Sequence, residues 1–395
     1  MSWRALAAAV VIVVLAACSG DDEQGAPGGT AAVTDGGVST AGPATTERSD
    51  RERDDDARDD DDAAGDDDDD DDSDYDRFAV DPLPAPDAAD VVVPEPAERV
   101  TCPTATTTVA DADGLAAALA AASPGDVIEL AAGRYDGNFV ASAEASDDSP
   151  IFLCGSADAV LAGEGPKESG YVLHLDGAAS WRVVGITVRD GRKGVMVDGG
   201  VGNVLQDLTV TSIGDEAIHL RAASTDNAVL DNQISDTGRR REKFGEGVYV
   251  GTAQSNWCTV SDCEPDRSDR NVVEGNVITD TTSEAIDIKE GTVDGVVLGN
   301  SFDGSAATAA DSWVDVKGNG WIVAANTGVA APEHGIQVHE IIKGWGSGNA
   351  FVGNTLAVDA DGFGFDLHGP EGSNLVACDN DVTGAAEGIS NEPCR

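Results

Sequence analysis

From about residue 180 the sequence repeats a unit of short apolar segments separated by small or polar turn residues. One turn residue recurs every 22 to 28 residues, except for one interval of 44 that contains two insertions, 238–244 and 253–270. This residue falls at Gly185, Asp207, Asn232, Asn276, Asn300, Asn326, Asn354 and Asn380. Asparagine tolerates the left-handed turn conformation, and stacked copies can hydrogen-bond to one another. A period of this length with Val- and Ile-rich segments predicts a parallel β-solenoid.

The composition agrees with an all-β chain. Aromatic residues make up only 5% of the 395 residues, and glycine contributes 47, which disfavours a helical bundle or a doubly wound enzyme. A doubly wound sheet would also need amphipathic helices of about 10–15 residues between its strands, and the repeats contain none. One helix is expected at 113–122, where an Ala- and Leu-rich run follows Asp111 and Asp113 as candidate caps. This helix would cover the open N-terminal end of the solenoid.

Three features resemble a known group of proteins. They are the expected helix, the stretch Ser-Pro-Gly-Asp-Val-Ile-Glu-Leu-Ala-Ala-Gly-Arg-Tyr at 123–135, and the Asn-x-Val-x-x-Asn-x-Ile pattern at 271–278. Together they resemble right-handed parallel β-helix proteins, especially the pectate-lyase-like polysaccharide lyases, over about 101–395. The resemblance implies an all-β right-handed parallel β-helix with a short N-terminal capping helix. This fold also carries hydrolases, epimerases and non-catalytic proteins, so the reaction must be argued from the site.

The first 17 residues have the form of an export signal. Arg4 precedes an apolar run over 5–17, which is shorter than the roughly 20 residues of a transmembrane helix. The segment Leu-Ala-Ala-Cys at 15–18 resembles the lipobox of bacterial lipoproteins, which implies cleavage before Cys18 and lipid attachment to its sulfur. We therefore expect an exported protein that is anchored to the bacterial membrane through Cys18 and faces the extracellular side or the periplasm. An ordinary secretory signal with a chance cysteine is the alternative.

A disordered linker is expected at 18–100, followed by the β-helix domain at 101–395. The linker contains unbroken aspartate from Asp66 to Asp72 and few apolar residues, so self-repulsion disfavours packing. The whole chain has 24 Lys and Arg against 73 Asp and Glu, a net charge of −49, which argues against a nucleic-acid-binding protein. We expect the chain to be a monomer.

The cysteines fit an oxidising compartment. Apart from Cys18 there are six, an even number. Their order suggests the pairs Cys102–Cys154, Cys258–Cys263 and Cys378–Cys394, while other connectivities remain open. No two pairs show Cys-x-x-Cys spacing, so a zinc site is not expected.

The third strands of the repeats place chemically active side chains on one outer face. Their apolar residues alternate and must face the core, so the residues between them form two outward columns. The first column contains Met196, His219, Tyr249, Asp287, Asp315, Gln337 and Asp366. The second contains Asp198, Arg221, Gly251, Lys289, Lys317, His339 and His368. Neighbouring rungs lie about 4.8 Å apart, so Asp287, Lys289, Asp315 and Lys317 should form a compact square of alternating charge.

These columns suit β-elimination on a uronate-containing, acidic polysaccharide. The reaction removes the proton at C5, expels the sugar linked through O4, and needs a base and positive charge beside the uronate carboxylate. Lys289 is the candidate base, and Arg221 and Lys317 are expected to help catalysis by lowering its pKa. The candidate substrate-binding residues are His219, Tyr249, Asp315, His339, His368, Arg240 and Trp345. Trp257 and Trp313 could also stack on sugar rings, whereas Trp321 is expected in the core.

Calcium often assists lyases of the group that the chain resembles. Glu216, Glu246 and Glu284 each come immediately before an aligned strand, and together with Asp287 they are the candidate calcium ligands. Stacked carboxylates about 5 Å apart repel one another unless they are protonated or bridged by a cation. The alternative is that the three glutamates point into solvent.

Other functions remain open. A glycoside hydrolase would use Asp287 and Asp315 as paired carboxylates about 5 Å apart, and a C5-epimerase would share the first step of the lyase. A lipid-anchored β-helix that binds glycans or a protein partner without catalysis would use the charged square only as exposed ion pairs. The basic segment 238–243 either lines a cleft or pairs with nearby acidic residues.

Overall fold

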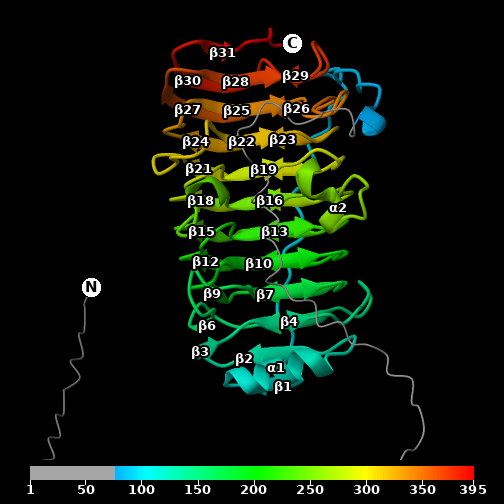
Figure 1. Ribbon diagram of the computed structural model, residues 1–395, viewed down its shortest axis with the longest axis vertical. Coiled ribbons are helices and arrows are strands. Elements are labelled where there is room, and N and C mark those ends of the chain that lie inside the picture. The colour runs from blue at the N-terminus through cyan, green and yellow to red at the C-terminus, as the bar shows by residue number, and fades with distance from the viewer. Residues whose placement is uncertain (1–75) are drawn as a thin grey trace, which may run out of the picture. The chain divides into compact units, whose positions relative to one another are not determined.

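The computed structural model describes residues 76–395, which form a parallel β-solenoid of about ten turns (Figure 1). In each complete turn the chain passes through three sheets, and strands that neighbour each other within a sheet pair in parallel. The predicted all-β, right-handed parallel β-helix is therefore confirmed. The predictions for residues 1–75, including the signal peptide, Cys18 and the run Asp66–Asp72, lie outside the described residues.

One sheet contains 11 strands and the other two contain 10 each. In order along the solenoid, sheet A contains β1 (Thr107–Val109), β2 (Val127–Leu130), β5 (Ile151–Cys154), β8 (Trp181–Val184), β11 (Val204–Gln206), β14 (Ala228–Leu230), β17 (Val272–Glu274), β20 (Val296–Leu298), β23 (Ile322–Ala324), β26 (Ala350–Val352) and β29 (Leu375–Val376). Sheet B contains β3 (Gly133–Asp136), β6 (Ala159–Ala162), β9 (Thr187–Arg189), β12 (Thr209–Thr211), β15 (Gln233–Ser235), β18 (Val277–Thr279), β21 (Ser301–Asp303), β24 (Thr327–Val329), β27 (Thr355–Ala360) and β30 (Asp381–Ala385). Sheet C contains β4 (Phe139–Ala141), β7 (Tyr171–Asp176), β10 (Lys193–Asp198), β13 (Ile218–Arg221), β16 (Val248–Val250), β19 (Ile286–Ile288), β22 (Ser312–Val316), β25 (His334–His339), β28 (Phe363–His368) and β31 (Gly388–Ser390).

The interior is filled by the alternate residues of all three sheets. Val, Ile and Leu side chains form a continuous core, as the period-two pattern of the strands requires. Trp313 and Trp321 also lie in this core, and two glycines make room for their indole rings. A Cβ atom on Gly328 would come within 2.5 Å of the Trp313 ring, and one on Gly295 within 2.2 Å of the Trp321 ring.

The recurring asparagines form a buried ladder at the turn between sheets A and B. It consists of Asn232, Asn276, Asn300, Asn326, Asn354 and Asn380. The Asn276 Nδ2 group, for example, donates to the Asn300 Oδ1 atom and to the carbonyl of Val229, each at 2.9 Å. The predicted stacking of asparagines is therefore confirmed. A second, shorter ladder of Asn203, Asn227 and Asn271 was not predicted.

The N-terminal end of the solenoid is capped by the helix α1 (Ala112–Ala121), which begins one residue before the expected position (Figure 1). The Asp111 side chain accepts a hydrogen bond from the backbone N–H of Gly114 at 2.8 Å, as expected of an N-cap. Leu115 and Leu119 pack into the core beneath the helix. No helix within residues 76–395 is long and apolar enough to cross a membrane.

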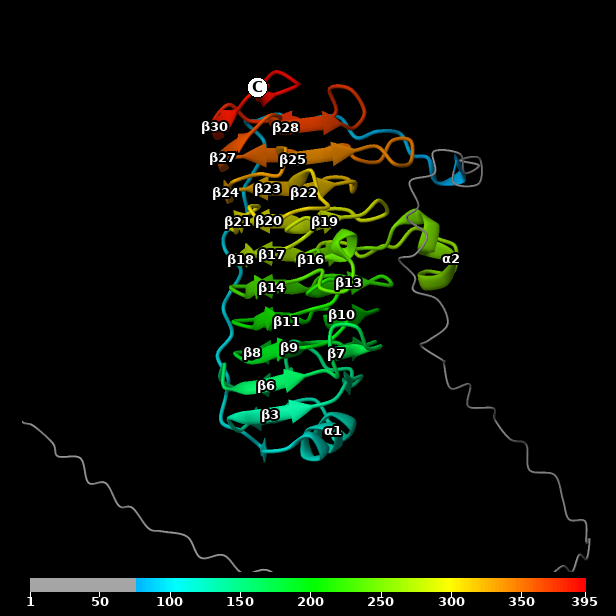
Figure 2. The ribbon, with the colours of Figure 1, turned by 60° about the vertical axis from the view of Figure 1, so that its left-hand side comes forward.

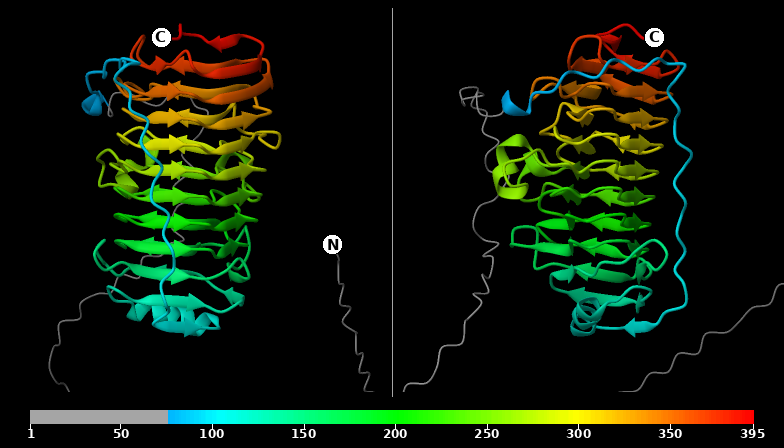
Figure 3. Two further views of the ribbon diagram at one scale, coloured as in Figure 1. Left: turned by 180° about the vertical axis from the view of Figure 1, so that it is seen from behind. Right: turned by 90° about the vertical axis from the view of Figure 1, so that its right-hand side faces the viewer.

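Residues 76–100 form a strap that follows the outside of the solenoid from its C-terminal turns to its middle turns, and the chain then continues along the same side to β1 (Figure 3). It begins with the short 3₁₀ helix η2 (Asp76–Phe78). Near this end the Leu83 N–H donates to the Ser347 hydroxyl at 3.0 Å, and near the other end the Arg99 guanidinium pairs with Asp231 and Glu274. The linker expected at 18–100 therefore does not extend to residue 100, because 76–100 are packed on the solenoid.

The two insertions form short helical loops on the side of sheet C. The first contains the 3₁₀ helix η3 (Glu242–Phe244), and the second contains η4 (Gln254–Asn256) and α2 (Trp257–Val260), which projects beside β16 (Figure 2). The three disulfides that the cysteine order suggested are all present, Cys102–Cys154, Cys258–Cys263 and Cys378–Cys394.

Candidate active site

The outer face of sheet C carries both predicted columns in the predicted register. Strand pairing aligns Met196, His219, Tyr249, Asp287, Asp315, Gln337 and Asp366 on successive rungs. It also pairs Asp198 with Arg221 at one end of the second column and His339 with His368 at the other. Lys289 and Lys317 follow directly after β19 and β22, which places them in the middle of the face.

Asp287, Lys289, Asp315 and Lys317 form one ion-pair network. Asp287 contacts the Lys289 Nζ atom at 2.6 Å and the Lys317 Nζ atom at 2.8 Å, and Lys317 also contacts Asp315 at 2.6 Å. The predicted charged square is therefore present. Because Asp287 and Asp315 are only 2% and 4% exposed, these pairs are shielded from water and are not the exposed ladder of the non-catalytic alternative.

This network keeps Lys289 charged. Burial opposes its charge, but Asp287 and Glu290 outweigh burial and raise the pKa of Lys289 far above its ordinary value. The expectation that Arg221 and Lys317 lower this pKa is wrong. Arg221 pairs instead with Asp198 at 2.7 Å, and Lys317 shares the carboxylate of Asp287.

A small cavity of about 100 Å³ opens beside Lys289. It is lined by Glu216, Lys243, Phe244, Glu246, Tyr249, Ala253, Ser255, Asn256 and Lys289, so both insertions contribute to its wall. The Lys289 Nζ atom lies 5.0 Å from the centre of the Tyr249 ring, and the His219 ring meets the same ring edge-on at 4.4 Å. The structure thus brings an ammonium group and a phenol together at a concave point of the outer face.

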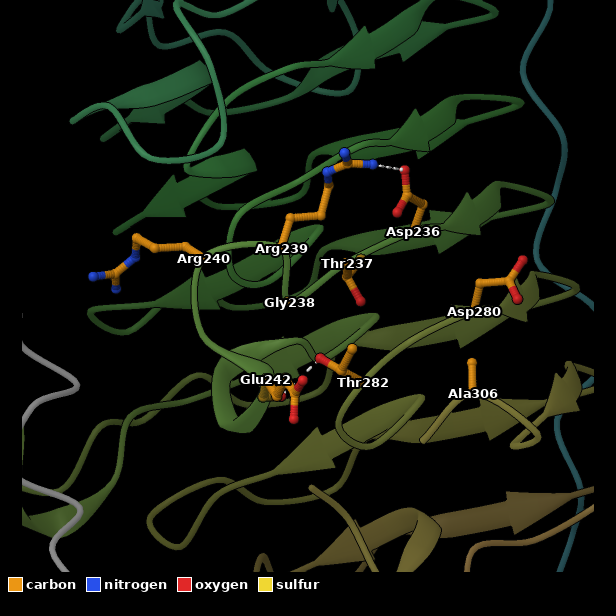
Figure 4. Close-up of a pocket in the computed structure, with 9 residues that line it drawn as sticks. All are labelled: Asp236, Thr237, Gly238, Arg239, Arg240, Glu242, Asp280, Thr282 and Ala306. Atoms are coloured by element: carbon orange, nitrogen blue, oxygen red, sulfur yellow. Dashed lines mark hydrogen bonds and ion pairs between the residues drawn. The ribbon is translucent and has the colours of Figure 1, made fainter. Parts of the chain in front are cut away.

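A larger hollow of about 570 Å³ lies beside this face, along the turns between sheets B and C (Figure 4). Its lining includes three acidic residues, Asp236, Glu242 and Asp280, and the guanidinium of Arg239 points to Asp236 at 2.6 Å. Arg240 points away from the hollow in Figure 4 and pairs with buried Asp215 at 2.7 Å. We take the smaller cavity as the candidate active site, because the residues of the two columns do not line the larger hollow.

The C-terminal end of the face carries two stacked histidines. The rings of His339 and His368 lie 5.7 Å apart, nearly parallel. The His339 Nδ1 atom is 2.9 Å from Asp315, and the His368 Nε2 atom is 2.8 Å from Asp366. Both histidines are partly or largely exposed, so they are available to a ligand lying along sheet C.

The His339–Asp315 pair predicts a pH-dependent contribution to stability. Burial disfavours the charged ring, but Asp315 outweighs burial and raises the pKa of His339. A group with a raised pKa stabilises the fold below its unfolded pKa of about 6.5, and this contribution disappears as pH rises through the raised value. We expect His339→Gln to lower the thermal unfolding temperature more at pH 6 than at pH 9. An equal decrease at both pH values would contradict this assignment.

Several predicted substrate-binding residues are not accessible. Trp345, Trp257 and Trp313 are buried, and Trp345 packs with Trp257 beneath the strap residue Phe78, so stacking of these indoles on sugar rings is wrong. Trp321 lies in the core as expected. His219 is 1% exposed and its Nε2 atom lies 2.9 Å from the carbonyl of Gly251, so it supports the Tyr249 ring from behind the surface.

The three glutamates before the aligned strands do not point into solvent. Glu216 and Glu246 are buried and Glu284 is partly buried. Oxygen atoms of Glu246, Glu284 and Asp287 lie within 4.8 Å of one another, whereas Glu216 contacts the Lys193 Nζ atom at 3.1 Å. The structure thus brings three of the four candidate calcium ligands together.

Sequence reasoning missed the rungs β4, β7 and β31 of this sheet. Strand β7 pairs with β10 and adds His174 and Asp176 to the columns, and the His174 Nε2 atom lies 2.9 Å from Asp198. The Tyr171 hydroxyl accepts a hydrogen bond from Arg221 at 3.1 Å. The alternating segment Tyr-Val-Leu-His-Leu-Asp at 171–176 carries the same signal as the other third strands, but it precedes the region in which the repeat was recognised.

Comparisons with known proteins agree with this architecture. A family described as periplasmic copper-binding protein (NosD) matches residues 136–329. The crystal structure of an alginate lyase from Paenibacillus sp. str. FPU-7 is 32% identical, with a TM-score of 0.66, and the match covers 74% of this chain and 100% of that one. The pectate lyase Pel9A is 14% identical (TM-score 0.48, 74% of this chain and 82% of that one), and a rhamnogalacturonan lyase is 11% identical (TM-score 0.49, 70% and 87%). No curated protein matches the chain significantly.

Proposed function

Because the chain belongs to the pectate-lyase-like superfamily of right-handed parallel β-helix proteins, we propose that it is a polysaccharide lyase acting on a uronate-containing polysaccharide. The observation that carries the proposal is the small cavity at which Lys289 and Tyr249 meet on the outer face of sheet C. The similarity to an alginate lyase over that protein's whole length supports alginate as the first substrate to test.

The ion pairs disfavour a hydrolase that would use Asp287 and Asp315 as its two carboxylates. A glycoside hydrolase needs one protonated carboxylic acid beside the scissile bond. Burial would favour the protonated form of Asp315, but Lys317 and His339 outweigh burial and lower its pKa. Asp287 is held between Lys289 and Lys317. Both aspartates therefore hold lysine ammonium groups in place. Such cations can bind the carboxylate of a uronate.

We assign the positive charge of the reaction to Lys289. Its ammonium group would neutralise the uronate carboxylate and stabilise the negative charge that develops as the C5 proton leaves. Since Asp287 keeps Lys289 protonated, Lys289 is not the base, and another group of the cavity takes that role.

Tyr249 is the group placed to move the proton. Its ring lies 5.0 Å from the Lys289 Nζ atom, and its phenol oxygen, as the phenolate, can accept the C5 proton. The electrons of the C5–H bond then form the C4–C5 double bond, the C4–O4 bond breaks, and the leaving O4 takes up a proton. The products are an unsaturated uronate end and a new sugar end.

This β-elimination does not require a metal ion bound to the substrate. Calcium, as the cation that related lyases often use, would supply further positive charge beside carboxylates when bound. The oxygen donors Glu246, Glu284 and Asp287 fit such an ion, but Glu246 and Asp287 are buried, so an ion held there would be shielded from a polysaccharide on the surface.

We propose that the protein works outside the cytoplasm. Its three disulfides and its match to a family described as periplasmic support export. A lipid anchor at Cys18 remains part of the proposal, since that residue lies outside the described part of the chain.

The test is to incubate the purified chain with alginate, pectate and glycosaminoglycans and to follow the ultraviolet absorbance of the unsaturated product. We expect absorbance to rise with at least one uronate polymer, alginate first. New reducing ends without absorbance would instead indicate a hydrolase. A change in uronate configuration without cleavage would indicate an epimerase. Binding without any of these changes would indicate a non-catalytic β-helix lipoprotein.

A further inference from the structure

Glu246, Glu284 and Asp287 form a compact group of carboxylates at the edge of sheet C. Glu246 and Glu284 occupy equivalent positions on adjacent rungs, since the N–H of Gly247, next to Glu246, donates to the carbonyl of Glu284 at 3.0 Å. One oxygen atom from each of the three carboxylates lies within 4.8 Å of the other two. Like charges this close repel strongly when they are buried.

The neighbouring cations do not neutralise this group. Asp287 already shares Lys289 and Lys317, and Lys317 is also shared with Asp315. Within residues 76–395, no ion pair joins Glu246 or Glu284 to a lysine, arginine or histidine. The two glutamates thus leave two negative charges without a matching cation.

Glu246 supplies a second, independent observation at this group. It is 4% exposed, and its Oε2 atom is buried without a hydrogen-bond partner among the described residues. Glu284 receives a hydrogen bond of 2.5 Å from the Ser283 hydroxyl. A buried, unpaired carboxylate oxygen is costly, and folded proteins satisfy such atoms with a partner, a proton or a metal ion.

We propose that Glu246, Glu284 and Asp287 bind one divalent cation, with calcium as the ion that fits best. Calcium–oxygen distances of about 2.3–2.6 Å allow ligand oxygens on opposite sides of the ion to lie about 5 Å apart, which matches the group. One doubly charged ion balances the two glutamates that lack a cation.

The bound ion would fix the positions of residues in the candidate active site. It would hold Glu246, Glu284 and Asp287 together, and Asp287 in turn orients Lys289 and Lys317. The inference goes beyond the proposed function, because the ion stabilises the solenoid whether or not the chain cleaves a polysaccharide. It differs from a cation that bridges enzyme and substrate, since two of its three ligands are buried.

The test measures the thermal unfolding temperature of the full chain in chelator and after addition of calcium, together with calcium binding by calorimetry. At about 100 times the dissociation constant, calcium should raise the unfolding temperature by several degrees, with one ion bound per chain. Glu246→Gln and Glu284→Gln should each abolish most of this increase. Glu216→Gln is the matched control, because Glu216 occupies the equivalent position one rung away but pairs with Lys193.

The outcomes are distinct from those of the activity assay, because the readout is folding and binding in the absence of polysaccharide. Retention of the calcium response in Glu216→Gln and its loss in both other variants would support the site. No calcium-dependent change in the native chain would overturn it and would leave the two glutamates protonated. An unchanged response in Glu246→Gln and Glu284→Gln would also overturn it, by placing the ion elsewhere.

Discussion

Replacing Lys289 by alanine is expected to lower kcat/KM on alginate by about 10²–10³, the cost of removing one preorganised charge from a developing oxyanion. The Lys289 side chain lines the small cavity, and the alanine variant leaves the uronate carboxylate without its nearest ammonium group. The decrease is measured from initial rates of ultraviolet absorbance. Tyr249→Phe should lower kcat by a similar or larger factor of about 10²–10⁴, because it removes the group that moves the proton.

A lysine-to-arginine exchange separates the roles of charge and proton transfer. Lys289→Arg keeps a positive charge beside Asp287, so it should retain more activity than Lys289→Ala. Lys343→Ala is the control, because Lys343 is exposed and lies in the loop after β25, and its rate should stay within about twofold of the native rate. Full activity in Lys289→Ala would show that the active site does not lie in this cavity. Equal inactivity of the alanine and arginine variants would return the role of base to Lys289.

Replacing Asn276 by alanine is expected to cost about 2–5 kcal/mol of unfolding free energy, because buried polar partners lose their hydrogen bonds. Asn276 is fully buried, and its Oδ1 atom accepts hydrogen bonds from both the N–H and the side-chain amide of Asn232 at 2.9 Å. Its own Nδ2 group donates a hydrogen bond to the carbonyl of Val229. The loss is measured as a lower denaturation midpoint in urea.

The control for this ladder lies one turn further along the solenoid. Ser301 is exposed on β21, next to Asn300, and Ser301→Ala should change the unfolding free energy by no more than about 0.5 kcal/mol. If Asn276→Ala unfolds at the same urea concentration as the native chain, the asparagine ladder does not stabilise the solenoid.

The sequence was sufficient for the architecture because a period-two strand pattern determines which side chains face outward. Every residue of the first column, from Met196 to Asp366, has the predicted neighbour. The pKa of Lys289 was not predictable in the same way. Arg221 and Lys317 were counted as its neighbours within one column, but Asp287, two residues away on the same strand, is the group in contact.

Burial of Trp257 and Trp345 could not be predicted because the residues that cover them are not part of the repeat. Trp257 and Trp345 lie in an insertion and a long loop, and they are closed over by Phe78 of the strap. The strap contains Pro82, Pro84, Pro86, Pro94 and Pro96 and no apolar period, so its composition is that of a linker. Its contacts with distant turns identify it as part of the fold, among them the hydrogen bonds to Ser347 and Gln206 and the ion pairs of Arg99.

The strap also sets the order in which the chain can complete its fold. Residues 76–100 leave the ribosome or an export channel before any rung, yet Val80 is hydrogen-bonded to the carbonyl of Lys343, more than 260 residues later in the sequence. Solenoid turns can assemble one after another as they emerge, because each contacts mainly its neighbours. The first residues of the strap must wait for the turn that contains Lys343 and Ser347, so this end docks only after most of the solenoid has formed.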